Sequence, residues 1–96
     1  MQLMQVVGTV VSTQKDEKLN GVKFLIGKEI RMDGTMTETY HVAVDTVGAG
    51  PGEVVIIVRG SSARLTDATD KKPVDTAIIG IVDEIEVAGN IVWKKH

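Results

Sequence analysis

Three closely spaced glycines, Gly48, Gly50 and Gly52, are the first residues of this chain whose spacing is suited to chemistry. Such glycines cradle phosphates when their loop opens a helix whose N-terminus points at the ligand. The stretch that follows, EVVIIVRG, is dense in β-branched residues and predicts a strand instead. The chain also lacks the Gly-Lys-Ser/Thr sequence of a P-loop. We therefore interpret the glycines as a tight corner between two strands, stiffened by Pro51.

The serines of the sequence GSSAR, Ser61 and Ser62, are candidates for a nucleophile. A nucleophile elbow needs a glycine on both sides of the serine and a base within hydrogen-bond reach. The residue two after Ser62 is Arg64, and the two histidines are His41, inside a predicted strand, and the terminal His96. We predict no catalytic serine. We expect Ser61 or Ser62 to cap a short helical turn over SARLTD, where a hydroxyl satisfies a free amide.

Three aspartates, Asp45, Asp75 and Asp83, end apolar runs. A glycosidase or a metal site would need two or three carboxylates to converge. Aspartate is also common in turns, where its side chain accepts hydrogen bonds from nearby amides. We therefore expect these side chains to bind loop amides or to pair with an arginine, namely Arg31, Arg59 or Arg64. The sequence predicts no catalytic residue, no metal site and no cofactor.

Composition narrows the class of protein further. The 96 residues carry a formal net charge of −2, with both signs interspersed, which argues against a nucleic-acid or anionic-membrane partner. The absence of cysteine excludes disulfides, thiolate metal sites and a cysteine nucleophile. No stretch reads as a signal peptide or reaches transmembrane length. We expect one soluble domain over residues 1–96, with a core of aliphatic residues and methionine.

Hydrophobic alternation predicts strands nearly throughout the chain. Five apolar or β-branched segments give five strands, at residues 3–12, 22–30, 39–45, 53–60 and 77–82. Asp33-Gly34 lies between the second and third and is typical of a hairpin turn. A second alternation, around Gly89-Asn90, predicts a small C-terminal hairpin, and the tail Lys94-Lys95-His96 is expected to be solvated or to meet an acidic neighbour.

The two faces of these strands differ in polarity. The second strand places Val22, Phe24, Ile26 and Ile30 on one face and Lys23 and Glu29 on the other. The third places Tyr40, Val42 and Val44 opposite His41, Ala43 and Asp45. The first, fourth and fifth strands are apolar on both faces, as in Val55 and Ile57 opposite Val54, Ile56 and Val58. In a small barrel only one face fills the interior, so we expect another copy of the chain to cover the second.

Three long blocks of the sequence resemble one protein family. They are VVGTVVSTQKDEKLNGVKFLI, VAVDTVGAGPGEVVIIVRGSSAR and PVDTAIIGIVDEI, and together they span nearly the whole chain in order. They are similar to the bacterial microcompartment vertex proteins of the EutN/CcmL type. The resemblance implies an all-β fold, a small five-stranded OB-like β-barrel with a short helical turn and an extra C-terminal hairpin. It also implies a homo-pentamer that caps the vertices of a polyhedral shell in the bacterial cytoplasm, beside hexameric shell proteins, without catalysis.

The resemblance also implies a set of motif positions at corners, caps and subunit contacts. They are Thr13, Lys15, Leu19, Gly21, Lys23, Asp45, Gly48, Ala49, Gly50, Gly52, Glu53, Gly60, Ser61, Ser62, Ala63, Arg64, Asp75, Gly80, Ile81, Val82 and Asp83. We expect the corner at residues 45–64 to contribute to subunit contacts, because Arg64 offers a planar fork to a neighbour's carboxylate. The alternative is an OB-like barrel that binds single-stranded nucleic acid or a small ligand, although the few aromatic residues and the acidic balance argue against it.

Overall fold

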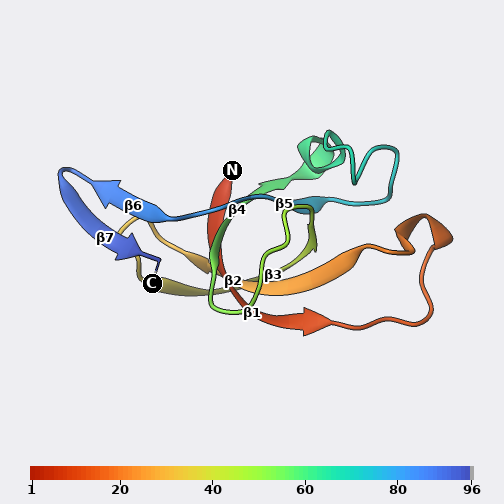
Figure 1. The fold of residues 1–96 in the computed structure, drawn as a ribbon, viewed down its shortest axis with the longest axis horizontal. Coiled ribbons are helices and arrows are strands. Elements are labelled where there is room, and N and C mark those ends of the chain that lie inside the picture. The colour runs from red at the N-terminus through yellow and green to blue at the C-terminus, as the bar shows by residue number, and fades with distance from the viewer. Residues whose placement is uncertain (96) are drawn as a thin grey trace.

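A closed five-stranded barrel and a separate two-stranded hairpin make up the computed structural model, which describes residues 1–95 (Figure 1). The barrel strands are β1 (Gln2–Val10), β2 (Lys23–Ile30), β3 (Met36–Asp45), β4 (Val54–Arg59) and β5 (Thr76–Ile81). The hairpin strands are β6 (Glu84–Val87) and β7 (Asn90–Lys94), and two short 3-10 turns are η1 (Glu17–Leu19) and η2 (Gly60–Arg64). The predicted all-β barrel with a helical turn and a C-terminal hairpin is confirmed.

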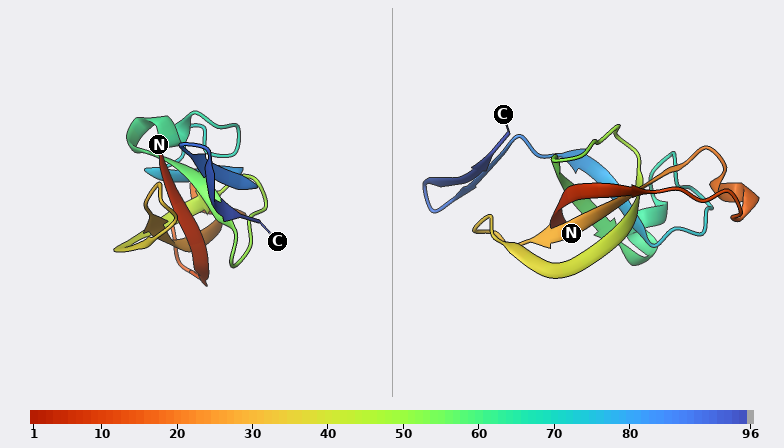
Figure 2. Two further views of the ribbon diagram at one scale, coloured as in Figure 1. Left: turned by 90° about the vertical axis from the view of Figure 1, so that its left-hand side faces the viewer. Right: turned by 90° about the horizontal axis from the view of Figure 1, so that it is seen from below.

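Strand pairing closes the barrel in the order β1-β2-β3-β5-β4. The β3–β5 pair is parallel and the other barrel pairs are antiparallel. The molecule is elongated, 45 × 23 × 23 Å, because the hairpin projects from one end and the loops that carry η1 and η2 extend from the other (Figure 2). Residues of the 46–53 loop connect β3 to β4.

The barrel interior is a single apolar cluster. Its buried members are Met4, Val6, Leu25, Ala43, Ala49, Val55, Ile57 and Ile78. On β2 and β3 the inward face is not the more apolar one. Leu25 is inward on the face of β2 that also carries Lys23 and Glu29, and on β3 the buried His41 and Ala43 point inward while Tyr40 and Val42 are exposed.

Two further clusters cover part of the outer surface. Ala63 of η2 and Val74 pack on Val44 and Val58, and Ile85 of the hairpin packs with Val54. The expectation that only another copy covers the second apolar face is therefore wrong for β4, whose outward valines are buried by the chain itself. Exposed apolar side chains remain on β1 and β3, among them Val7 and Val42.

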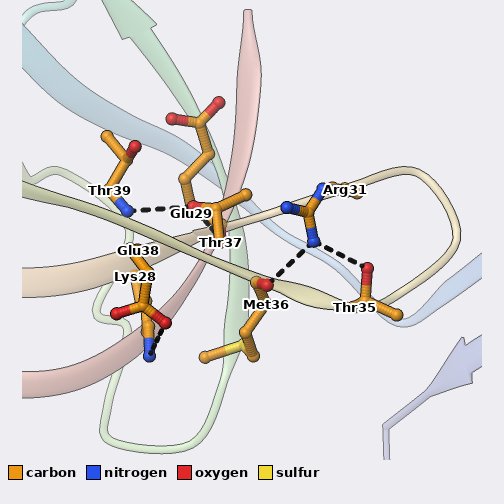
Figure 3. Close-up of polar contacts among 8 residues, drawn as sticks. All are labelled: Lys28, Glu29, Arg31, Thr35, Met36, Thr37, Glu38 and Thr39. Carbon is orange, nitrogen blue, oxygen red and sulfur yellow. Dashed lines mark hydrogen bonds and ion pairs between the residues drawn. The ribbon is translucent and has the colours of Figure 1, made fainter.

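The two hairpin turns differ from each other. In the β2–β3 turn, Asp33 Oδ1 accepts hydrogen bonds from the amide of Thr35 (2.9 Å) and from its hydroxyl (2.6 Å), which lower the pKa of the Asp33 carboxyl. Arg31 Nη1 donates to Thr35 Oγ1 and to the Met36 carbonyl (Figure 3). The C-terminal turn is formed by Ala88-Gly89 rather than the predicted Gly89-Asn90.

The reason for that difference lies in the backbone. Ala88 and Gly89 have φ of 52° and 84°, and Asn90 already pairs with Val87 in the β6–β7 ladder. A two-residue type I′ turn requires positive φ at both central residues, so these two positions fix the turn one residue earlier.

Close packing inside the barrel requires a glycine on β2. A Cβ added to Gly27 would overlap Met4 Sδ and would lie 2.5 Å from Met4 Cε and 2.6 Å from Met4 Cγ. Met4 is fully buried, so its side chain has little room to withdraw. Gly27 therefore makes space for Met4 in an interior too narrow for both side chains.

We expect Gly27→Ala to lower the free energy of unfolding by about 1–3 kcal/mol, as overpacking of a filled core does. Urea denaturation of wild type and variant measures the change. Gly80→Ala is the matched control, because a Cβ there meets Ile56 Cδ1 at an ordinary 3.5 Å. Equal stability of the two variants would contradict the account of Met4 and Gly27.

Candidate functional site

The 46–53 corner is held by hydrogen bonds from its own residues. Asp45 Oδ1 accepts from the amides of Val47 (3.0 Å) and Gly48 (3.1 Å), as predicted for this aspartate. Gly48 and Gly52 have φ of 79° and 85°, so they occupy the left-handed region that disfavours other residues. The interpretation of these two glycines as a tight corner between strands is confirmed, whereas Gly50 has no positive φ.

Ala49 lies between these glycines and closes the barrel. It is only 1% exposed and belongs to the interior cluster. Its carbonyl accepts a hydrogen bond from Lys23 Nζ at 3.2 Å. Lys23, a motif position on β2, therefore holds Ala49, a motif position in the corner. The corner therefore inserts a small apolar side chain into the interior while a lysine holds its backbone.

Glu53 holds the 46–53 corner in its turn and joins the corner to β1. Its Oε1 accepts from the Gly50 amide at 2.8 Å, and its carbonyl accepts from the Val6 amide at 2.9 Å. The Gly52 amide donates to the Val6 carbonyl at 2.8 Å. Glu53 thus closes the turn through its side chain, and its carbonyl pairs the end of the corner with β1.

The C-terminal tail meets the same carboxylate. Lys95 Nζ lies 2.9 Å from Glu53 Oε2, and the Lys95 amide donates to the Asp83 carbonyl at 2.9 Å. Of the two expectations for the tail, an acidic neighbour is confirmed for Lys95, while His96 lies outside the described residues. The hydrogen bond with Lys95, and then that from the Gly50 amide, lower the pKa of Glu53, and Glu53 raises the pKa of Lys95.

The serines of η2 do not cap it. The turn begins at Gly60, with φ of 68°, and the residue before it, Arg59, makes no side-chain capping hydrogen bond. The Gly60 amide instead donates to the Asp75 carbonyl at 2.7 Å. Ser61 and Ser62 are exposed inside the turn, so the predicted serine cap is wrong because a backbone bond from a distant segment anchors the turn start.

Arg64 bonds to backbone rather than to a carboxylate. Its Nη1 donates to the Val74 carbonyl at a long 3.4 Å, beside the buried Ala63. Among residues 1–95, no arginine forms an ion pair with an aspartate, so the predicted Asp–Arg pairing is not found. Asp75 Oδ1 accepts a 3.5 Å hydrogen bond from the Thr76 hydroxyl instead.

The first motif block lies partly apart from the corner. Lys15 Nζ donates to the Ser12 carbonyl at 2.9 Å, Thr13 is exposed, and Gly21 turns the chain with φ of 84°. Leu19 packs against the cluster under η2. In the third block Gly80 and Ile81 end β5, and Val82, which follows them, is buried beneath the hairpin. The structure therefore joins the second block to Lys23 and Asp83, but not to Thr13 or Lys15.

One buried polar pair escaped sequence reasoning. His41 Nε2 lies 3.0 Å from Glu29 Oε2, and the histidine side chain is nearly enclosed. The register of the β2–β3 hairpin could have predicted this pair. His41 pairs with Gly27, and Glu29, two residues after Gly27, lies on the same side of β2. His41 is thus a structural residue of the barrel with an orienting partner.

The three aspartates singled out from the sequence do not converge in residues 1–95. Asp45, Asp75 and Asp83 serve separate corners, and residues 1–95 contain no cluster of three or more His, Cys, Asp or Glu side chains suited to a metal ion. None of the helices in the described part of the chain is long and apolar enough to cross a membrane. The site is therefore a set of backbone anchors around one corner and the outer faces beside it.

The Glu53–Lys95 pair predicts a pH-dependent stability. A carboxyl group whose pKa is lower in the folded than in the unfolded protein stabilises the fold at pH values above the unfolded pKa, about 4.3. This stabilisation is lost as the pH falls through the folded pKa. A raised lysine pKa contributes below about 10.4 and is lost as pH rises through its folded value. We expect Glu53→Gln to lower the melting temperature at pH 6 and the difference from wild type to shrink on acidification toward pH 3.

Melting curves across this pH range check the prediction. Glu86→Gln, which removes an exposed carboxylate of β6, is the control and should show no comparable pH-dependent difference. An unchanged gap between Glu53→Gln and wild type at pH 3 and pH 6 would show that the ion pair does not stabilise the fold.

Known proteins share this architecture along its whole length. A family model described as "Ethanolamine utilisation protein EutN/carboxysome" matches residues 1–83. The carboxysome shell vertex protein CcmL of Nostoc sp. is 45% identical over 96 residues, covering 99% of this chain and 95% of that protein. The structure of Gloeobacter violaceus CcmL has a TM-score of 0.95 at 44% identity and covers 99% of this chain and 98% of that one.

A pentameric relative of known structure is also similar. The GrpN pentameric microcompartment shell protein from Rhodospirillum rubrum has a TM-score of 0.85 at 44% identity, covering 92% of this chain and 100% of that one. The proteins named by these likenesses are structural shell proteins rather than enzymes. The resemblance seen in the three sequence blocks is confirmed, and the chain belongs to the EutN/CcmL family.

Proposed function

We propose that this protein is a shell vertex subunit of a bacterial microcompartment, located in the shell within the bacterial cytoplasm. It assembles as a homo-pentamer and fills the five-fold positions that a flat layer of hexameric shell proteins leaves open. The observation that carries the proposal is the likeness to CcmL vertex proteins over nearly the full length of both chains. The likeness to pentameric GrpN supports the ring.

The interior of the barrel fits a structural role. It holds apolar side chains from all five strands and from Ala49. The residues that could do chemistry are engaged in holding backbone: Asp45 and Glu53 accept from corner amides, and Lys23 donates to a corner carbonyl. A subunit of this kind acts through its shape and its outer surface.

The motif positions divide into two roles under this proposal. Asp45, Gly48, Ala49, Gly52 and Glu53 shape the corner, as their hydrogen bonds, positive φ and burial indicate. Exposed positions of η2, namely Ser61, Ser62 and Arg64, are available to a neighbouring subunit. Neither nucleic acid nor membrane is among the partners that we propose.

Ring formation is directly measurable. We expect native mass spectrometry of the purified protein to show a dominant species at five times the subunit mass of 10.3 kDa. A stable monomer would contradict the proposal. If that monomer bound a single-stranded oligonucleotide with strong salt dependence, the alternative of an OB-like binding barrel would be favoured instead.

Substitution of Arg64, at the end of η2, tests the expectation that residues 45–64 contribute to subunit contacts. Its only hydrogen bond in the described chain is long and made to backbone, so its removal should disturb the subunit little. We expect Arg64→Ala to keep its melting behaviour as a monomer but to shift sedimentation from the ring toward smaller species at low protein concentration. Lys18→Ala, which removes an exposed cation of η1, serves as the control. An intact ring in the Arg64→Ala variant would remove the support for a contact there.

A further inference from the structure

The barrel carries two unlike apolar faces on its outside. The first, the β2–β3 face, comprises Phe24, Ile26, Tyr40 and Val42. The second, the β1–β4 face, comprises Leu3, Met32 and Ile56. In the closed order β1-β2-β3-β5-β4, β5 separates β3 from β4, so the two faces lie on different sides of the molecule.

The β2–β3 face is open to solvent in a single subunit. Tyr40 is 56% and Val42 is 52% exposed. Beside them a hollow of about 200 Å³ lies between Phe24, Val42 and the segment at Pro73. Val42 pairs with Ile26 across the strands, and Ile26 pairs with Gly8, whose missing side chain leaves the surface shallow there. An apolar surface of this kind indicates an interaction site.

The β1–β4 face is built in a similar way from other strands. Leu3 and Ile56 are direct cross-strand partners and line two adjoining hollows, one of which includes the 57% exposed Met32. Gly80 of β5 lies beside Ile56, so this surface is also shallow next to its isoleucine. Each face therefore presents exposed apolar side chains next to a glycine.

The hollow of the β1–β4 face is acidic, whereas the β2–β3 face carries both signs, with Lys28 beside Glu38 and Asp75 in its hollow. Asp83, Glu84 and Glu86 line the hollow of the β1–β4 face. On the β2–β3 face, Lys28 Nζ lies 5.5 Å from the centre of the Tyr40 ring and 3.7 Å from Glu38, whose side chain is 93% exposed. A weak exposed pair of this kind exchanges readily for a carboxylate of another subunit.

We propose that the β2–β3 face of one copy of this chain binds the β1–β4 face of the next. A contact between two different faces is heterologous, and repeated around an axis it closes into a ring, whereas a self-complementary face gives a two-fold dimer. This inference rests on the proposed ring and adds which surfaces form it.

The test uses one charged substitution on each face. Val42→Asp breaks the β2–β3 face and Met32→Asp the β1–β4 face, and both positions are more than half exposed, so the subunit should still fold. We expect each variant alone to lose the ring in native mass spectrometry. Mixed together, each retains the face that the other lacks, so we expect a dimer that contains one copy of each variant and no ring.

Controls separate this inference from the proposed function. A wild-type protein that forms no ring would contradict the proposed function itself. With a wild-type ring in hand, rings in both variants, or the absence of the mixed dimer, would overturn the pairing of these faces. If Met32→Asp unfolds by circular dichroism, Met32→Glu replaces it, because the longer side chain can extend its charge into solvent from the same exposed position. Val11→Asp, at an 88% exposed apolar position outside both faces, should leave the ring intact.

Discussion

Closure of only five strands leaves a barrel interior that holds little more than one small layer of side chains, and the remaining features of the subunit follow from this limit. Met4 fits only because Gly27 has no side chain, and the small side chain of Ala49 enters the interior from the corner. The chain is rich in aliphatic residues, so many of them must lie outside. There they are covered by η2, by the hairpin or by a neighbouring subunit.

Much of this fold could be predicted from the sequence, because strand periodicity and turn residues are local signals. The inward face of β2 could not, since the apolar pattern of Phe24 and Ile26 marks a covered outer surface as strongly as a core. The serine cap failed for a related reason: the Gly60 amide bonds to the Asp75 carbonyl, fifteen residues away, which no local rule reveals. The Glu53–Lys95 pair likewise joins segments that only the folded barrel brings together.

The corner shows how motif positions and geometry are related. Asp45, Gly48, Gly52 and Glu53 each have a structural reason within one subunit, either as a hydrogen-bond acceptor or as a residue with positive φ. Their presence therefore does not by itself require a contact with a neighbour. The candidate site divides accordingly: residues that shape the corner were found from sequence, whereas the outer faces emerged only when strand order placed Leu3 beside Ile56 and Ile26 beside Val42.

Barrel closure also limits how subunits of this kind can join. Most backbone groups of a closed barrel pair within the barrel, so the contact proposed above joins side-chain faces. β3 pairs with β5 only at Val44 and Asp45, and the β6–β7 hairpin is a separate two-stranded sheet with edges of its own. Side-chain contacts fix the angle between copies through the shape of two surfaces. In this subunit, the glycines beside Ile26 and Ile56 leave each surface shallow enough for a neighbour's side chains to approach closely.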